Sequence, residues 1–262
     1  HHYFAGGWYP RGGSTCIAKG IIPIIEKTGG RVLVRKAVSE ILIKDGRACG
    51  VKMANGDEIF AKEIISGCGV FNTYKKLLPK LKAPKKQLSQ ERSSSAVIFY
   101  WGIQKIFNTL ELHNIFFSDD YRAEFDAIFK EETVSDDPTI YLNITSKDVP
   151  GDAPAGCENW FIMINTPANK GQDWDEMVSK LRTIVINKLS KELAVNLASL
   201  IVCEEVLTPP LIQSKTQSHL GALYGSSSNN SFAAFLRHPN FSSRIKNLYF
   251  CGGSVHPGGG IP

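Results

Sequence analysis

Residues 248–262, LYFCGGSVHPGGGIP, are the stretch that decides how this sequence is interpreted. A short apolar strand, LYFC, leads into Gly252-Gly253, and Pro257 then precedes a run of three glycines. Glycines placed directly after a strand allow the backbone to approach a flat or anionic ligand closely. The segment therefore predicts a ligand-binding loop, and a glycine-rich turn that holds no ligand is the alternative.

The N-terminal quarter predicts a glycine-rich loop, one helix and several short strands. Residues 3–13, YFAGGWYPRGG, form the loop, and a helix with an isoleucine face follows it. Residues 31–35, RVLVR, alternate as a strand does, and Asp45-Gly46 and Asn55-Gly56 are tight-turn signals. We expect two short hairpins and a buried strand at residues 64–66.

The middle of the chain predicts a second set of strands and helices. Its strongest strand is residues 95–106, SAVIFYWGIQKI, which is rich in β-branched and aromatic residues. Apolar residues at helical spacing predict a long helix over residues 174–194. Shorter strands are expected at 140–144, 160–165 and 200–206, and residues 213–245 are expected to be polar and irregular.

Composition limits the class of protein. Hydrophobic residues make up 43% of the chain, which is enough for a sizeable core, and the net charge of +5 gives no reason to expect a nucleic-acid partner. None of the six cysteines forms a CxxC pair, so we expect reduced, buried thiols without a disulfide framework and without a metal site. This cysteine usage predicts a cytoplasmic protein, with or without peripheral contact to a membrane.

Three segments resemble one protein family. LYFCGGSVHPGGGIP is similar to the C-terminal flavin motif of the carotenoid (phytoene) desaturases and retinol saturases, in which a strand, a Gly pair, His-Pro-Gly and Gly-Ile-Pro follow in that order. Residues 8–56 resemble the family's Tyr-Pro-x-Gly-Gly loop, helix and paired-strand block. Residues 207–225, LTPPLIQSKTQSHLGALYG, carry the Thr-Pro and Gly-x-x-Tyr-Gly elements. The resemblance covers residues 1–75 and 205–262 well.

The resemblance implies an FAD-dependent oxidoreductase and assigns residues to its cofactor site. Val38 matches the strand residue whose backbone holds the adenine side of FAD. The loop over the flavin is matched by Gly252, Gly253, Gly258, Gly259 and Ile261. The turn near the ring system or the substrate entrance is matched by Arg11, Gly12 and Gly13. His256 is the candidate for a hydrogen-bonding or proton-moving group, with a structural loop histidine as the alternative.

The sequence also departs from the family, because the strand–GxGxxG–helix that binds the ADP half of FAD is absent from these residues. We therefore expect a C-terminal fragment whose parent binds FAD and which alone retains little or none. Its fold class is predicted as α/β, or α+β for this fragment. Residues 1–75 and 240–262 are expected in a partial Rossmann-like FAD-binding layer, and residues 76–239 in a substrate domain with a mixed sheet and flanking helices.

The implied activity is redox chemistry at a C–C bond of a long apolar isoprenoid or polyene. The aromatic residues Phe99, Tyr100, Trp101, Phe116, Phe117 and Phe161 are candidates to line a substrate tunnel, and ordinary core packing is the alternative. A flavin amine oxidase would share the fold. A non-catalytic module that binds lipid surfaces through lysines of residues 75–86 is the third reading. The sequence leaves the oligomeric state open.

Overall fold

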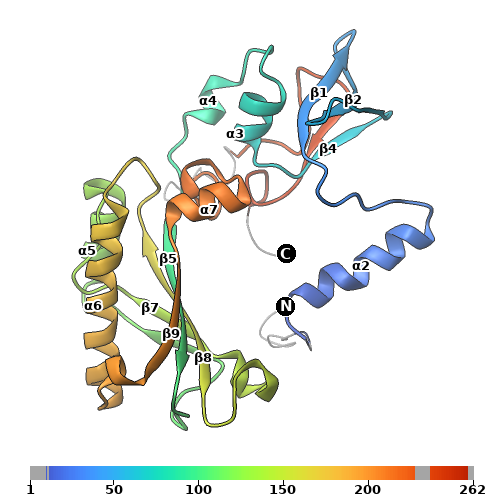
Figure 1. Cartoon of the computed structure of the whole chain (residues 1–262). Helices are drawn as coiled ribbons and strands as arrows, with labels where there is room; N and C mark the ends of the chain where they lie inside the picture. Colours follow the sequence, from blue (N-terminus) through green and yellow to red (C-terminus); the bar gives the residue numbers. More distant parts are fainter. Residues whose placement is uncertain (1–9, 11, 228–236, 259–262) are drawn as a thin grey trace.

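The computed structural model describes residues 10, 12–227 and 237–258, which form two lobes with separate sheets (Figure 1). The upper lobe in that view contains two small sheets, and the lower lobe contains one five-stranded sheet covered by helices. The chain passes from the upper lobe to the lower one before β5 and returns through α7. The mixed helix-and-sheet class expected from the sequence is confirmed.

A three-stranded antiparallel sheet follows the first helix, in the order β1-β2-β3. Its strands are β1 (Val38–Lys44), β2 (Arg47–Met53) and β3 (Glu58–Phe60). Asp45 and Gly46 join the first two strands, and both have positive φ angles, 50° and 72°. Two left-handed residues match the twist of a tight hairpin, so the turn predicted from Asp-Gly forms where expected.

The helix α2 (Thr15–Lys27) forms as predicted but buries none of its residues. Residues 28–37 join it to β1, and the strand expected at residues 31–35 is wrong, because no regular structure forms there. Val32, Leu33 and Val34 are exposed, and no described strand pairs with them. An alternating sequence does not make a strand unless a neighbouring strand supplies its backbone hydrogen bonds.

A parallel pair, β4 (Ile64–Ser66) and β10 (Leu248–Phe250), joins the two distant ends of the sequence. The register pairs Ile65 with Tyr249, and Cys251 donates its backbone N–H to the Ser66 carbonyl at 3.0 Å. Parallel strands place the segments that follow them at the same edge. The glycine-rich segment after β10 therefore lies beside the segment that starts at Gly67.

The core of the upper lobe lies between these strands and three short helical segments. They are α3 (Val70–Asn72), the π-helical turn Thr73–Leu77 and α4 (Lys85–Leu88). Its buried side chains are Ile41, Ala48, Val70, Tyr74, Leu78, Ile245, Leu248, Phe250 and Val255, with Leu88 packed against them. This core continues past residue 75, where the boundary between the two expected domains was placed. The division into domains stays a prediction.

The lower lobe contains a five-stranded sheet in the order β6-β7-β8-β5-β9. The strands are β5 (Ser95–Ile103), β6 (His113–Phe116), β7 (Ile140–Asn143), β8 (Glu158–Thr166) and β9 (Ile201–Leu207). Every neighbouring pair is antiparallel, so the expectation of a mixed sheet is wrong for this lobe.

Helices cover one face of the five-stranded sheet. They are α5 (Tyr121–Asp126), the π-helical turn Ala127–Glu131 and α6 (Trp174–Leu193). Asp173 caps α6 by accepting the Glu176 backbone N–H, and Leu181, Val185 and Leu189 are completely buried on its inner side. The helix predicted for residues 174–194 is confirmed. Single turns of 3₁₀ helix occur at Thr145–Lys147, Pro150–Asp152, Leu197–Leu200 and His219–Gly221.

Two expectations need correction. The helix α7 (Pro209–Thr216) extends into the segment expected to be irregular, because Thr208 caps it and two prolines occupy its first turn, where they cost no hydrogen bond. The cysteines were expected to be buried thiols. All six are free, but none is fully buried, and Cys203 and Cys251 are exposed.

Candidate functional site

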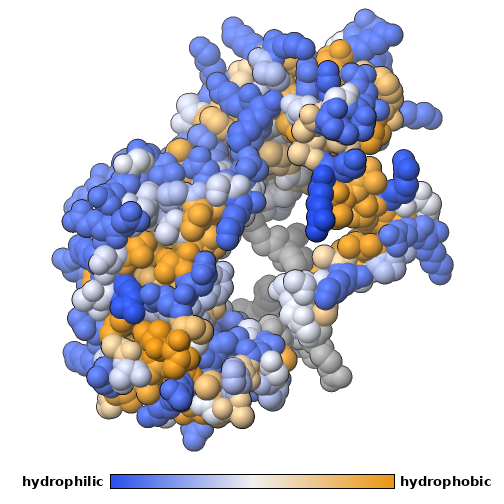
Figure 2. Space-filling view, in the orientation of Figure 1, coloured by the Kyte–Doolittle hydropathy of each residue, from blue (hydrophilic) through white to orange (hydrophobic). Residues whose placement is uncertain are grey.

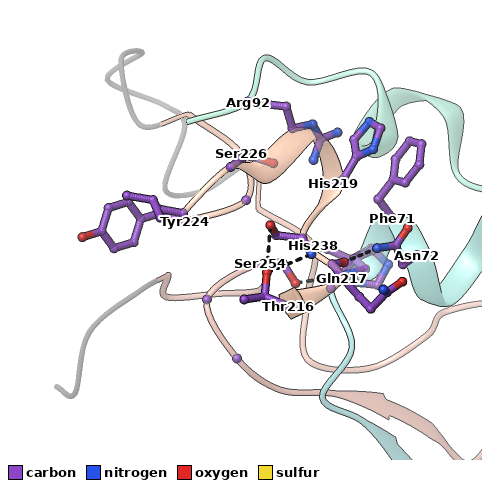
Figure 3. A pocket seen from close by; sticks show the side chains of 18 of the residues that line it. Phe71, Asn72, Arg92, Thr216, Gln217, His219, Tyr224, Ser226, His238 and Ser254 are labelled. Carbon is purple, nitrogen blue, oxygen red and sulfur yellow. Dashed lines mark hydrogen bonds between the residues drawn. The ribbon is translucent and has the colours of Figure 1, made fainter. Parts of the chain in front are cut away.

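A cavity of about 280 Å³ opens beside the glycine-rich segment that follows β10 (Figure 3). Its wall is built from segments far apart in the sequence, namely residues 67–72, 88–92, 212–219, 222–226 and 251–254, together with His238. The parallel pairing of β4 with β10 creates this meeting point, because both strands end at it. The ligand-binding loop predicted from the sequence therefore lies at a cavity.

Glycine backbone forms much of this wall. Gly67, Gly69, Gly225, Gly252 and Gly253 all line the cavity. Two of them have the left-handed φ angles that glycine adopts without strain, 74° for Gly225 and 98° for Gly252. A Cβ on Gly225 would lie 3.1 Å from the Cα of Ser254. The absence of side chains leaves a shelf against which a flat ligand can lie.

Arg237 fixes the shape of this shelf from behind. Its side chain is buried, and its guanidinium donates to the carbonyls of Tyr224 at 3.0 Å and Gly253 at 2.8 Å. It donates further to the carbonyl of Ser226 at 3.2 Å. A Cβ on Gly258 would lie 3.1 Å from the Arg237 Cζ, and the φ angle of Gly258 is 127°, so a larger residue is strained where the loop passes this side chain. The arginine therefore joins the two glycine-rich segments into one wall.

His238 and Tyr74 support the same wall from the core of the upper lobe. The His238 ring lies 3.3 Å from the Tyr74 hydroxyl at one nitrogen and 2.7 Å from the Pro239 carbonyl at the other. Burial lowers the pKa of His238, and the hydrogen bond to the Pro239 carbonyl opposes that change in part. Both ring nitrogens are occupied, so we assign this histidine a structural role.

The opposite part of the wall carries aromatic and cationic side chains. The His219 ring is stacked on Phe71, with ring centroids 3.4 Å apart and an interplanar angle of 6°. The Arg92 guanidinium lies over the Phe71 ring, with its Cζ 5.7 Å from the ring centroid. Burial, and then the charges of Arg92 and Lys76, lower the pKa of His219 to about 4. The imidazole is therefore neutral at pH 7.

The second candidate surface is the face of the five-stranded sheet that α6 does not cover (Figure 1). Tyr100 and Phe161 form a cross-strand pair on this face, with ring centroids 5.5 Å apart in a T-shaped arrangement. Tyr141 extends the aromatic surface, 6.3 Å from Phe161. A largely apolar cavity of about 600 Å³ lies against it, flanked by residues 152–157. This surface suits a long apolar ligand.

The aromatic residues proposed for a tunnel divide between the two faces of the sheet. Phe99 and Trp101 are buried in the core under α6, as the packing alternative predicted. Phe116 packs partly against the same core, and Phe117 is exposed. Tyr100 and Phe161 face the second cavity. Alternation along β5 and β8 explains the division, because successive side chains of a strand point to opposite faces.

The structure brings only some of the predicted cofactor residues together. Gly252 and Gly253 line the first cavity, and Gly258 packs against Arg237 behind it. Val38 begins β1, pairs with Met53 and does not line that cavity. Gly12 and Gly13 stand at the start of α2, where Gly13 bonds to Pro10. Arg11, Gly259 and Ile261 lie outside the described residues.

His256, the candidate catalytic residue, is exposed and does not line the first cavity. Its backbone N–H donates to the His238 carbonyl at 3.0 Å. Sequence reasoning missed Arg92, His219 and Arg237, which do line or shape the site. Arg92 and Arg237 stand in segments without a motif, and His219 lies within residues 207–225 but outside the Thr-Pro and Gly-x-x-Tyr-Gly elements of that segment. Only the fold brings the three residues to the cavity. Within the described ranges, no helix is both long and apolar enough to cross a membrane.

Comparison with curated proteins identifies relatives of known activity along nearly the whole chain. It is 51% identical over 257 residues to the 1-hydroxycarotenoid 3,4-desaturase of Flavobacterium sp. (strain P99-3), which covers 98% of this chain and 52% of that protein. It is 38% identical to the 4,4'-diapolycopene oxygenase of Methylomonas sp., over 100% of this chain and 53% of the relative. It is 32% identical to the phytoene desaturase of Fusarium fujikuroi, over 97% of this chain and 49% of the relative.

The chain thus spans about half the length of the curated relatives that it matches. A scan against protein-family models gave no match. The resemblance to carotenoid desaturases expected from the sequence is confirmed by these relatives, and the chain is homologous to the carotenoid desaturases and oxygenases.

Solved structures show the same fold in distant proteins. An oxidoreductase from Methanosarcina mazei aligns with a TM-score of 0.58 at 13% identity, over 93% of this chain and 50% of that one. A variant of putrescine oxidase aligns with a TM-score of 0.55 at 14% identity, over 91% of this chain and 46% of that one. At such low identity these likenesses establish the fold only.

Proposed function

We propose that this chain, a homologue of about half the length of carotenoid desaturases, belongs to a flavin-dependent oxidoreductase that acts on C–C bonds of an apolar polyene. The observation that carries the proposal is the glycine-lined cavity beside an open aromatic sheet face. A desaturase needs a place for a flat redox cofactor next to a surface for a long hydrocarbon. Relatives named as carotenoid enzymes support the same substrate class.

The first cavity fits a flavin by its shape and its lining. Gly252 and Gly225 have backbone angles that exclude other residues without strain, and the wall between them presents backbone rather than side chains. We assign the flavin ring to this shelf, with Gly252 and Gly253 beneath it and Gly258 holding the loop against Arg237. The remaining predicted contacts, from Val38, Arg11, Gly12, Gly13, Gly259 and Ile261, stay proposals.

The strand β5 leads from this cavity to the aromatic surface. At its upper end Ser95 donates to the Gly221 carbonyl at 2.7 Å, close to the glycine-lined wall. Tyr100 follows five residues later, which is about 17 Å along an antiparallel strand. Ala96 and Ile98 share the face of Tyr100 but are buried, so the exposed part of this face begins at Tyr100. A linear polyene lying on this exposed part, with one end directed toward the flavin shelf, would contact Tyr100 and Phe161. We propose this face as the wall of the substrate site.

The chemistry is the removal of two hydrogens from a saturated C–C bond. When held on the shelf of Gly252 and Gly253, a flavin would supply the acceptor for a hydride from one carbon. The second hydrogen would pass from the neighbouring carbon to solvent as a proton when the double bond forms. The protein's own residues then have three tasks. They orient the polyene along β5, exclude water at the aromatic face, and keep the flavin shelf rigid through Arg237.

The amine oxidase alternative has less support. The similarity to putrescine oxidase is one of fold at 14% identity, whereas the carotenoid enzymes match at 32 to 51%. A module that only binds lipid surfaces would have no use for the glycine-lined cavity. We further propose a cytoplasmic protein that touches a membrane, because its polyene substrates dissolve in lipid. Flotation of the full-length protein with lipid vesicles tests this, and a protein that stays at the bottom would contradict it.

The flavin assignment is tested by a single glycine substitution in the full-length protein that contains this chain. Gly258→Ala places a Cβ at a φ of 127°, against the Arg237 guanidinium. Strain of about 1–3 kcal/mol at such a position should weaken FAD binding by roughly tenfold or more. Isothermal titration of FAD into the apoprotein measures the change.

Gly151→Ala is the matched control. Gly151 is exposed, its φ is not in the left-handed range, and a Cβ there meets nothing within 4 Å. Its FAD affinity should equal that of the unchanged protein. Equal FAD affinity for the unchanged protein, Gly258→Ala and Gly151→Ala would contradict the proposed site. So would the absence of FAD binding by all three.

A further inference from the structure

Arg92 has an uncompensated charge at the wall of the first cavity. Its guanidinium is half-buried, and burial lowers its pKa. Among the described residues it has one hydrogen bond, to the Leu88 carbonyl, and no carboxylate within ion-pair distance. A guanidinium has five N–H donors, so most of its capacity is unused. The arginine can therefore bind an acceptor inside the cavity.

His219 offers a complementary group beside it. Stacking on Phe71 fixes its ring, and the following turn fixes its backbone, because Leu220 and Gly221 both have left-handed φ angles of 57° and 66°. A Cβ on Gly221 would lie 2.5 Å from the Pro209 carbonyl oxygen, so this turn has no freedom to accept a larger residue. In the described part of the chain neither ring nitrogen of His219 has a hydrogen-bond partner. A neutral imidazole carries one donor and one acceptor.

Both side chains line the first cavity, on the wall opposite the glycine shelf to which we assign the flavin, where one end of the polyene would arrive (Figure 3). Apolar side chains of Leu88, Ile212 and Leu223 share the same lining. A pure hydrocarbon would displace water from Arg92 and His219 and leave them without partners, which is unfavourable. A hydroxyl group would satisfy both, because it accepts from the guanidinium and donates to the unprotonated imidazole nitrogen.

We propose that Arg92 and His219 form a subsite for an oxygen-bearing end group of the polyene, with a hydroxyl as the preferred group. The inference rests on the proposed function, because it needs one end of the polyene to reach the first cavity beside the flavin. A phosphate or carboxylate fits less well, since the neutral imidazole contributes no charge and the lining beside it is apolar. The two residues thus select among polyenes by their ends and are specificity-determining rather than catalytic.

The test compares two polyenes that differ only in a terminal hydroxyl. Each is titrated into the full-length, FAD-loaded protein, and the circular dichroism induced in the visible band of the polyene reports binding. We expect the hydroxylated polyene to bind roughly tenfold or more tightly than the hydrocarbon. Arg92→Gln should reduce the ratio of the two affinities by a similar factor. His219→Phe keeps the stack but removes both nitrogens, and it should reduce the ratio as well.

Arg122→Gln is the matched control, because it makes the same chemical change on an exposed residue of α5. It should leave the ratio as it is in the unchanged protein. Equal binding of the two polyenes by the unchanged protein, or a ratio that survives both Arg92→Gln and His219→Phe, would overturn the proposal. Failure of the proposed function gives a separate result. The two polyenes would still bind with different affinities, but neither would reduce the flavin under anaerobic conditions.

Discussion

At the scale of single residues, Arg237 links the two glycine-rich segments of the first cavity. One guanidinium holds the carbonyls of Tyr224, Ser226 and Gly253, so two glycine-rich segments share a single support. The sequence indicated the glycines, because glycine after a strand is a recognisable pattern. It could not indicate Arg237 or Arg92, because an arginine in an irregular segment has no pattern until the fold brings its partners to it.

His219 gives a prediction about pH. Its pKa in the folded protein is about 4, against 6.5 for a free imidazole, so the unfolded chain binds more protons between these values. The contribution of the neutral imidazole to the free energy of unfolding is fully present above pH 6.5 and is lost as the pH falls toward 4. The cations that face it, Arg92 and Lys76, act in the same direction.

His219→Phe should therefore flatten the dependence of the free energy of unfolding on pH over this window. Urea denaturation of both proteins at several pH values between 4 and 6.5 measures the difference. If the free energies of unfolding of the two proteins depend on pH in the same way across this window, the description of His219 as a half-buried, neutral imidazole is wrong.

At the scale of elements, local sequence patterns identified the elements that local packing determines. The helix α6 was predicted from apolar residues at helical spacing and the strand β5 from its β-branched and aromatic residues, and their observed bounds are close to those expected. The pairing of β4 with β10 could not be predicted, because it joins segments about 180 residues apart in a parallel register. The expected strand at residues 31–35 failed for the related reason that no described strand lies beside it.

The packing of α6 predicts how the lower lobe responds to a cavity. Leu189 is completely buried against the five-stranded sheet, so Leu189→Ala should lower the free energy of unfolding by about 2–5 kcal/mol. Asn187→Ala, on the exposed side of the same helix, should change it by less than about 0.5 kcal/mol. Urea denaturation followed by circular dichroism gives both values. Similar losses for the two variants would show that α6 does not pack as described.

At the scale of the whole molecule, the upper lobe has apolar surface that nothing in the described chain covers. Ile17, Ile21 and Ile24 on α2 are exposed, as are Val34 before β1 and Phe60 in β3. Figure 2 shows hydrophobic patches over α2 and the adjoining part of the upper lobe. The curated relatives are about twice as long as this chain. We propose that the remaining half of the full-length protein packs on this surface and supplies the other part of the FAD site. On that basis we expect the 262-residue chain alone to retain little or no flavin.

The most direct test of the central claim is an anaerobic reaction of the full-length, FAD-loaded protein with a linear polyene. The account predicts that the visible absorbance of the oxidised flavin disappears as the absorbance of the polyene shifts to longer wavelength, with one flavin reduced for each new double bond. A flavin that stays oxidised in the presence of polyenes, while an amine reduces it, would contradict the assignment to polyene chemistry.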